Sequence, residues 1–161
     1  MSKPPADLTL RSATVDDLPA LRTLWFAFET WLNTVGEPEQ IDPRKFDGFA
    51  QLAFGARPLC HVVLALRGAT PIGYLVYHVG VWMDDMAPAL FVADLYADER
   101  RSGVGRALME FARETALAAD CKHLFWTVWR KNTAAQAFYA SLGAEVFSDE
   151  ILMRWTAAVL A

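Results

Sequence analysis

Cysteine and histidine are scarce in this sequence. Its 161 residues include two cysteines, Cys60 and Cys121, and three histidines, His61, His78 and His123. Two isolated cysteines are too few for a disulfide scaffold, and none of these side chains has the spacing of metal ligands. Cys60 and His61 are neighbours in an extended run, where their side chains point apart, so they do not form a nucleophile with its base. We therefore expect neither a bound metal nor a cysteine nucleophile.

Long hydrophobic runs and an excess of positive charge are also missing. Residues 1–7 lack the apolar segment of a signal peptide, and no later run reaches the roughly 18 apolar residues of a membrane span. The formal net charge is −4, whereas nucleic-acid binding relies on a positive field. These absences predict a cytoplasmic protein with no membrane and no nucleic-acid partner.

The residues that are present suit a folded core. Apolar residues make up 54% of the chain and charged residues 21%, which at this length predicts one compact domain over residues 1–161. In chain order the patterns predict a strand at 8–11, a helix from 14–17 to before 36, a short helix at 46–54, strands at 60–67, 72–82 and 89–97, a helix after 105, a strand at 122–129, a helix from 132 or 133 to 142, and closing strands within 145–155.

This order of elements predicts the fold class. A hairpin turn at 67–71 joins two antiparallel strands, and the run at 122–129 is apolar on both faces, as in a buried strand reached by a parallel crossover. The sequence therefore predicts an α+β fold, which is α/β in the broad sense. Its sheet is mixed and mostly antiparallel, with helices on both faces.

The most informative segment is the loop R-R-S-G-V-G-R at 100–106, between a predicted strand and a predicted helix. Gly103 and Gly105 allow a tight turn with inward-pointing amides, and the helix that follows adds the positive end of its dipole. Such a turn suits a diphosphate. The simpler alternative is an ordinary turn that starts a helix. A dinucleotide-binding fold is disfavoured because the third glycine of its motif is missing.

Three features occur together in a fixed order: R-x-x-G-x-G at 100–105, Asn132, and A-F-Y-x-x-x-G at 137–143. In this combination they resemble the GCN5-related N-acetyltransferase (GNAT) superfamily, over about residues 89–143. The resemblance implies acetyl-CoA as cosubstrate and no metal. It also implies that the loop holds the pyrophosphate of acetyl-CoA through Arg100, Arg101, Ser102, Gly103, Val104, Gly105 and Arg106.

In that family the strand before the loop pairs with the pantetheine arm as though with another strand. The resemblance implies contacts at Ala93, Leu95 and Ala97, with two registers open. Counting back from Gly103 without gaps gives Ala93 and Leu95, whereas matching D-L-Y-A at 94–97 to the family's common run requires a shift of two residues. Leu95 belongs to both registers.

The resemblance also implies roles for two residues near the last predicted helix. Asn132 meets the cofactor or, equally simply, caps that helix. Tyr139 is the expected catalytic residue, because a nearby phenol can protonate the departing coenzyme A thiolate; the alternative is that its ring only packs in the core. The chain also resembles diamine acetyltransferases, but Ala93 stands where they carry glutamate. The general base stays open among Asp94, Asp84 and Asp85.

Taken together, these features predict an acetyl-CoA-dependent N-acetyltransferase in which a primary amine attacks the thioester directly within a ternary complex. The alternative is a non-catalytic acyl-CoA-binding or protein-interaction module of the same fold. The acidic charge balance favours a small-molecule amine as substrate. A homodimer is a further expectation, and the six tryptophans offer side chains for an acceptor pocket or a dimer contact.

Overall fold

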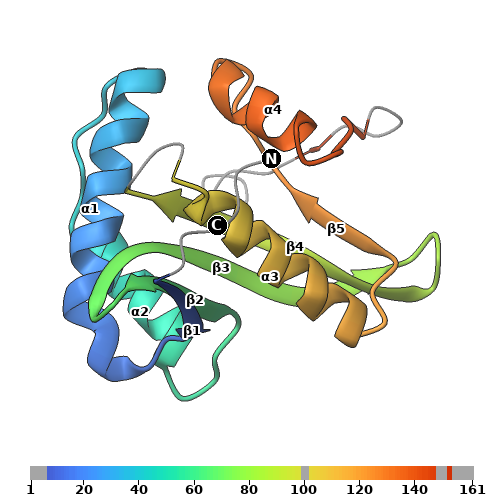
Figure 1. The fold of residues 1–161 in the computed structure, drawn as a ribbon, viewed down its shortest axis with the longest axis horizontal. Helices are drawn as coiled ribbons and strands as arrows, with labels where there is room; N and C mark the ends of the chain where they lie inside the picture. Colours follow the sequence, from blue (N-terminus) through green and yellow to red (C-terminus); the bar gives the residue numbers. More distant parts are fainter. Residues whose placement is uncertain (1–6, 99–101, 148–151, 154–161) are drawn as a thin grey trace, which may run out of the picture.

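A five-stranded sheet forms the centre of the computed structural model, which describes residues 7–98, 102–147 and 152–153 (Figure 1). The strands are β1 (Leu8–Ser12), β2 (His61–Arg67), β3 (Thr70–Trp82), β4 (Ala87–Ala97) and β5 (His123–Trp126), which lie in this order across the sheet. Neighbouring strands are antiparallel except for β4 and β5, which are parallel. This arrangement confirms the predicted mixed, mostly antiparallel sheet.

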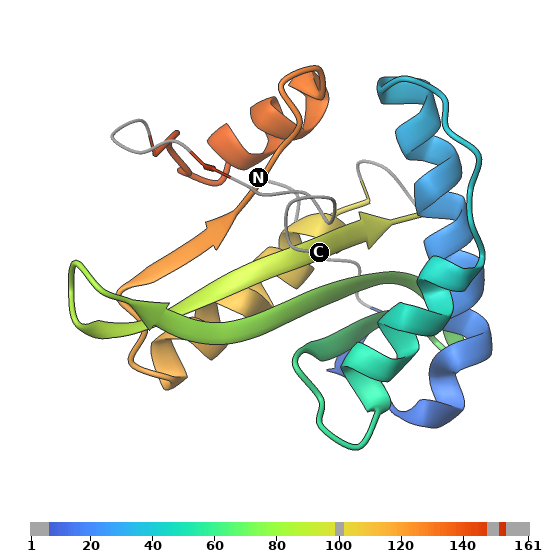
Figure 2. The same ribbon diagram turned by 180° about the vertical axis from the view of Figure 1, so that it is seen from behind.

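Helices cover both faces of the sheet, as predicted (Figures 1 and 2). The helices are α1 (Leu18–Val35), α2 (Arg44–Phe54), α3 (Val104–Ala118) and α4 (Thr133–Ala140), and a 3-10 turn at Val15–Asp17 precedes α1. Leu108 and Ala112 of α3 pack with one sheet face, and Leu21 and Trp25 of α1 pack with the other. None of the helices within the described ranges is long and apolar enough to cross a membrane.

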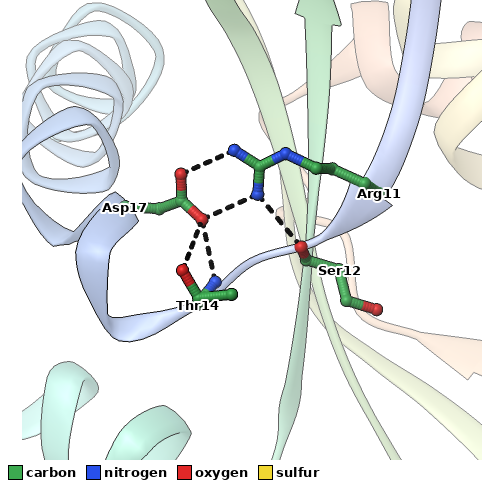
Figure 3. Close-up of polar contacts among 4 residues, drawn as sticks. All are labelled: Arg11, Ser12, Thr14 and Asp17. Atoms are coloured by element: carbon green, nitrogen blue, oxygen red, sulfur yellow. Dashed lines mark hydrogen bonds and ion pairs between the residues drawn. The ribbon is translucent and has the colours of Figure 1, made fainter.

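The start of α1 is fixed to β1 by one carboxylate (Figure 3). Asp17 accepts two hydrogen bonds from the Arg11 guanidinium, both 2.7 Å, and a third from the backbone N–H of Thr14 at 2.8 Å. The hydrogen bond from Arg11 is the main reason why the pKa of Asp17 lies well below its usual range. This network is the helix start that the Thr14 and Asp17 pattern predicted.

An irregularity in β4 shapes the end of the sheet where β4 and β5 part. Asp94 pairs with Val76 of β3, whereas Val92 pairs with Tyr77, so Ala93 is an extra, bulged residue. The pairing of β4 with β5 extends only from Ala89 to Val92. From Ala93 onwards, β4 therefore runs along β3 alone.

Two predictions for the C-terminal third need correction. The predicted strand at 122–129 spans only His123–Trp126, and its side chains are half-buried because β5 pairs only with β4 in the described sheet. Residues 127–129 leave the sheet and turn towards α4. Residues 145–147 form no strand, and most of the other positions predicted for closing strands lie outside the described residues.

Candidate active site

The parting of β4 and β5 opens a cleft of about 960 Å³. Its floor is β4 from Val92 to Ala97, and α1 contributes Phe28 and Trp31 to its wall. The remaining wall comes from the start of α3, the segment after β5, and α4. Figure 1 shows α1 and α4 on either side of the end of β4. A volume near the upper end of the range for ligand pockets suits a large, extended ligand.

The floor of the cleft carries main-chain groups that the sheet does not use. The Asp98 N–H donates to the Ile72 carbonyl of β3 at 2.9 Å. Because hydrogen-bonded and non-hydrogen-bonded pairs alternate in an antiparallel ladder, the main-chain groups of Leu95 and Ala97 point away from β3. They face the side from which β5 has departed. The bulged residue Ala93 also lines the cleft.

The glycine loop begins α3 at the edge of the cleft. Gly103 is the N-cap residue of α3 and has a φ of 87°, a left-handed conformation that glycine adopts without strain. Gly105 faces α4, because a Cβ there would lie 3.4 Å from the Phe138 ring. The Val104 side chain is fully buried in the core, so only its main chain is available to a ligand.

The remaining loop residues differ in what the structure says of them. Arg106 lines the cleft, together with Gly103 and Gly105. Ser102 is half-buried just before the N-cap. Arg100 and Arg101, to which we assigned pyrophosphate contacts, lie outside the described residues.

Asn132 and Tyr139 both line the cleft. Asn132 is buried, and its side-chain oxygen accepts the Ala135 N–H at 3.1 Å, so it caps α4, which is one of the two roles predicted for it. The Tyr139 ring packs on Trp126, with ring centroids 4.9 Å apart. Burial, with a smaller contribution from the Asp94 charge, raises the pKa of Tyr139 to about 12. The phenol therefore keeps its proton at neutral pH.

Asp94 is the acidic side chain that lines this cleft. It is partly buried, and its carboxylate accepts the Tyr74 hydroxyl at 2.8 Å. Removal from water raises the pKa of Asp94 to about 7, although hydrogen bonds from Tyr74 and the Leu95 N–H oppose this rise. Glu29 of α1 lies close enough to add to it. The carboxyl group is thus placed to exchange a proton near neutral pH.

The segment after β5 also contacts the end of α1. The Trp129 ring covers Gly36, where a Cβ would approach ring carbon Cζ3 to 2.5 Å. Lys131 forms an ion pair of 3.2 Å with Glu37 next to it. These two contacts join the walls of the cleft across its α1 side.

The other candidate bases lie elsewhere. Asp85 pairs with His123 at the start of β5, and neither Asp84 nor Asp85 lines the cleft. Within the described ranges, no three histidine, cysteine, aspartate or glutamate side chains come together as a metal site would require. Trp31 was predicted only as one of the six tryptophans offered for an acceptor pocket or a dimer contact, and Phe28 was not predicted for the site, although the spacing of the two on one helix was a usable signal.

The chain matches the model of the acetyltransferase (GNAT) family over residues 19–144. It belongs to the GNAT family. This family normally uses acetyl-CoA as the acetyl donor, and membership makes the chain an acetyltransferase. The predicted resemblance to the superfamily is thereby confirmed, whereas nothing supports the more specific likeness to diamine acetyltransferases. No curated protein matches the chain.

Solved structures share this GNAT fold over nearly the whole chain. An integron cassette protein from the mobile metagenome of V. cholerae is 19% identical, with a TM-score of 0.81 and coverage of 97% of this chain and 96% of that one. An aminoglycoside acetyltransferase from an uncultured soil metagenomic sample is 18% identical, with a TM-score of 0.69 and coverage of 93% and 96%. A putative acetyltransferase from Agrobacterium tumefaciens is 25% identical, with a TM-score of 0.71 and coverage of 91% and 99%.

Proposed function

We propose that this GNAT protein transfers an acetyl group from acetyl-CoA to a primary amine, by direct attack within a ternary complex. The observation that carries the proposal is the free edge of β4. The main-chain groups of Leu95 and Ala97, which the described sheet does not use, face the same cleft as Tyr139 and the start of α3. An extended arm with amide groups can pair with such an edge as another strand would.

The start of α3 supports the binding of the pyrophosphate. The amides of the first helical turn have no partners within the helix, and the helix dipole favours negative charge at this end. Gly103 and Gly105 both line the cleft here. We assign the diphosphate to the amides from Ser102 to Arg106, with the Arg106 guanidinium as the cationic side chain next to them.

Two side chains supply the proton transfers. As the amine nitrogen bonds to the thioester carbonyl carbon, it must lose a proton, and Asp94 is the base that we assign. When the carbon–sulfur bond breaks, the electron pair leaves on the coenzyme A sulfur, and Tyr139 donates its proton there. A phenol is a weaker acid than a thiol. With the pKa of Tyr139 at about 12 and an ordinary thiol pKa of about 8.5, the transfer is uphill by about 5 kcal/mol. An uphill step of this size is accessible within the barrier of an ordinary enzymatic turnover.

The experiment is a comparison of Tyr139→Phe with the wild type on a panel of primary amines. We expect kcat to fall by about 100-fold to 1000-fold, as for the loss of a general acid, while the Kd for acetyl-CoA stays within twofold. Tyr77→Phe is the matched control, because Tyr77 packs on the α3 face and does not line the cleft. Equal kcat of Tyr139→Phe and the wild type would show that Tyr139 is not the general acid.

The same panel tests the reaction type. Direct transfer predicts ternary-complex kinetics, whereas a trapped acetyl-enzyme with ping-pong kinetics would contradict the proposal. Binding of acetyl-CoA without turnover of any amine would favour the non-catalytic module instead.

A further inference from the structure

A second cavity lies on the sheet face that α1 and α2 cover, opposite the face covered by α3. It has a volume of about 350 Å³. Most of its lining is apolar and comes from Trp25 of α1, Phe49 and Leu52 of α2, Leu59 before β2 and Val76 of β3. Figure 2 shows α2 in front of this face of the sheet. The Leu59 N–H donates to the Leu52 carbonyl at 2.8 Å, which fixes the two leucines at the rim to each other.

The two cavities meet at the bulge of β4. Ala93 and Asp94 line both the cleft and the second cavity. Asp94 of β4 lies on the same face of the sheet as Tyr74 of β3, and the two side chains share a 2.8 Å hydrogen bond. A group bound to the Asp94 carboxylate therefore stands at the junction, with one side open to the cleft. The Glu29 carboxylate adds a second negative charge near this point.

The chemistry of the second cavity limits what it can hold. Among the described residues no lysine or arginine lines it, and His78 is its basic side chain. Asp94 stands at one end, with the Glu29 charge close to it. A carboxylate near the amine would be repelled there. A polyamine would have to bury its second ammonium against the apolar walls, at a high desolvation cost. The volume lies at the small end of ligand pockets, so a large aminosugar does not fit.

We propose that the second cavity holds the carbon body of the acceptor, and that the acceptor is a primary monoamine with an apolar body of about one aryl ring or a branched alkyl chain. The amine then lies at Asp94 and reaches the thioester at the bulge. This inference rests on the proposed N-acetyltransferase function. It adds specificity residues, of which Leu52 at the rim is the most accessible to substitution because 48% of it is exposed.

A substrate series on the full chain tests the acceptor class. We compare 2-phenylethylamine with spermidine, phenylalanine and an aminoglycoside, using acetyl-CoA as donor. Burial of a phenyl ring is worth roughly 1.5–3 kcal/mol, so kcat/KM for 2-phenylethylamine should exceed that for spermidine by at least about tenfold. Phenylalanine should be the poorer substrate of the two that carry a phenyl ring. Preference for spermidine, phenylalanine or the aminoglycoside overturns the inference.

A variant that narrows the cavity tests its location. Leu52→Trp should raise the KM and the calorimetric Kd for 2-phenylethylamine by about tenfold, while the Kd for acetyl-CoA is unchanged. Leu117→Trp is the matched control, because Leu117 is an exposed leucine on α3, across the sheet. Equal amine affinity of Leu52→Trp and the wild type, or no measurable amine binding to the wild type, overturns the inference.

The two proposals fail in different ways. If 2-phenylethylamine binds and Leu52→Trp weakens its binding, but no amine is acetylated, the inference about the cavity holds and the proposed function fails. If amines are acetylated but Leu52→Trp has no effect on them, the function holds and the cavity inference fails.

Discussion

Ionisation of the buried Asp94 carboxyl lowers the stability of the fold, and Asp94→Asn should remove this penalty. In the unfolded chain this carboxyl has an ordinary pKa, near 3.8, whereas in the folded protein burial raises its pKa to about 7. Between these two pH values the unfolded chain releases the proton and the folded protein retains it. Stability therefore falls as the pH rises from about 4 to 7, and the penalty stays constant at higher pH.

The size of this penalty follows from the two pKa values. At about 1.4 kcal/mol per pKa unit, a rise from 3.8 to about 7 corresponds to about 4 kcal/mol at pH 8. Asparagine has no charge to bury, and its side-chain oxygen can still accept the Tyr74 hydroxyl. We expect Asp94→Asn to recover about 2–4 kcal/mol at pH 8. For a chain of this size, the melting temperature should rise by roughly 5–12 °C.

Denaturant unfolding of both proteins at pH 4 and at pH 8 is the assay. The gain in the free energy of unfolding should be present at pH 8 and should fall to below about 1 kcal/mol at pH 4, where Asp94 is protonated in the folded protein and close to half protonated in the unfolded chain. Asp42→Asn is the matched control, because the partly exposed Asp42 carboxyl has a pKa lowered by its hydrogen bonds with Arg44 and should show no gain.

The same variant separates stability from activity. If Asp94 is the base, Asp94→Asn should lose most of its turnover while gaining stability. A variant no more stable than the wild type at pH 8, or equally stabilised at both pH values, would refute the argument from burial.

Two further variants test the geometry of the cleft. Ala97→Pro removes an N–H that the sheet does not use, so it should weaken acetyl-CoA binding about tenfold in calorimetry with little change in melting temperature. As a control, Asp98→Pro removes the N–H that donates to Ile72 and should destabilise the fold. Unchanged affinity of Ala97→Pro for acetyl-CoA would contradict the role of this edge. Gly36→Ala places a Cβ against the Trp129 ring and should lower the melting temperature. As a control, Gly48→Ala in α2 meets no neighbour and should raise the melting temperature slightly. Equal changes in melting temperature for the two variants would show that the contact of Trp129 with Gly36 is unimportant.

Local sequence signals predicted most of the fold. The turn at 67–71, the pairing of Thr14 with Asp17 and the glycines at 103 and 105 each demand a particular backbone, so the elements next to them were correctly predicted. The prediction of a buried strand over 122–129 was too long, because the apolar side chains of this run indicated burial throughout. In the structure Trp126 lines the cleft instead, and an apolar wall of a site has the same composition as a core.

The features that define the site were harder to predict. The bulge at Ala93 depends on how β4 pairs with β3 and β5, and the alternation of residues 91–97 gives no sign of it. The second cavity combines side chains from α1, α2, β3 and β4, which no local pattern links. The sequence offered Asp94 as one of three candidate bases, and the structure shows that it lines both cavities.

The proposed reaction depends on the edge of β4 that binds the arm of the acetyl donor and directs its thioester towards Tyr139. A crystal structure of the chain with coenzyme A would show whether this edge is used. We expect main-chain hydrogen bonds between the pantetheine amides and Leu95 and Ala97, with the sulfur within about 3.5 Å of the Tyr139 hydroxyl. Coenzyme A bound away from this edge, or a sulfur far from that hydroxyl, would rule out this mode of catalysis.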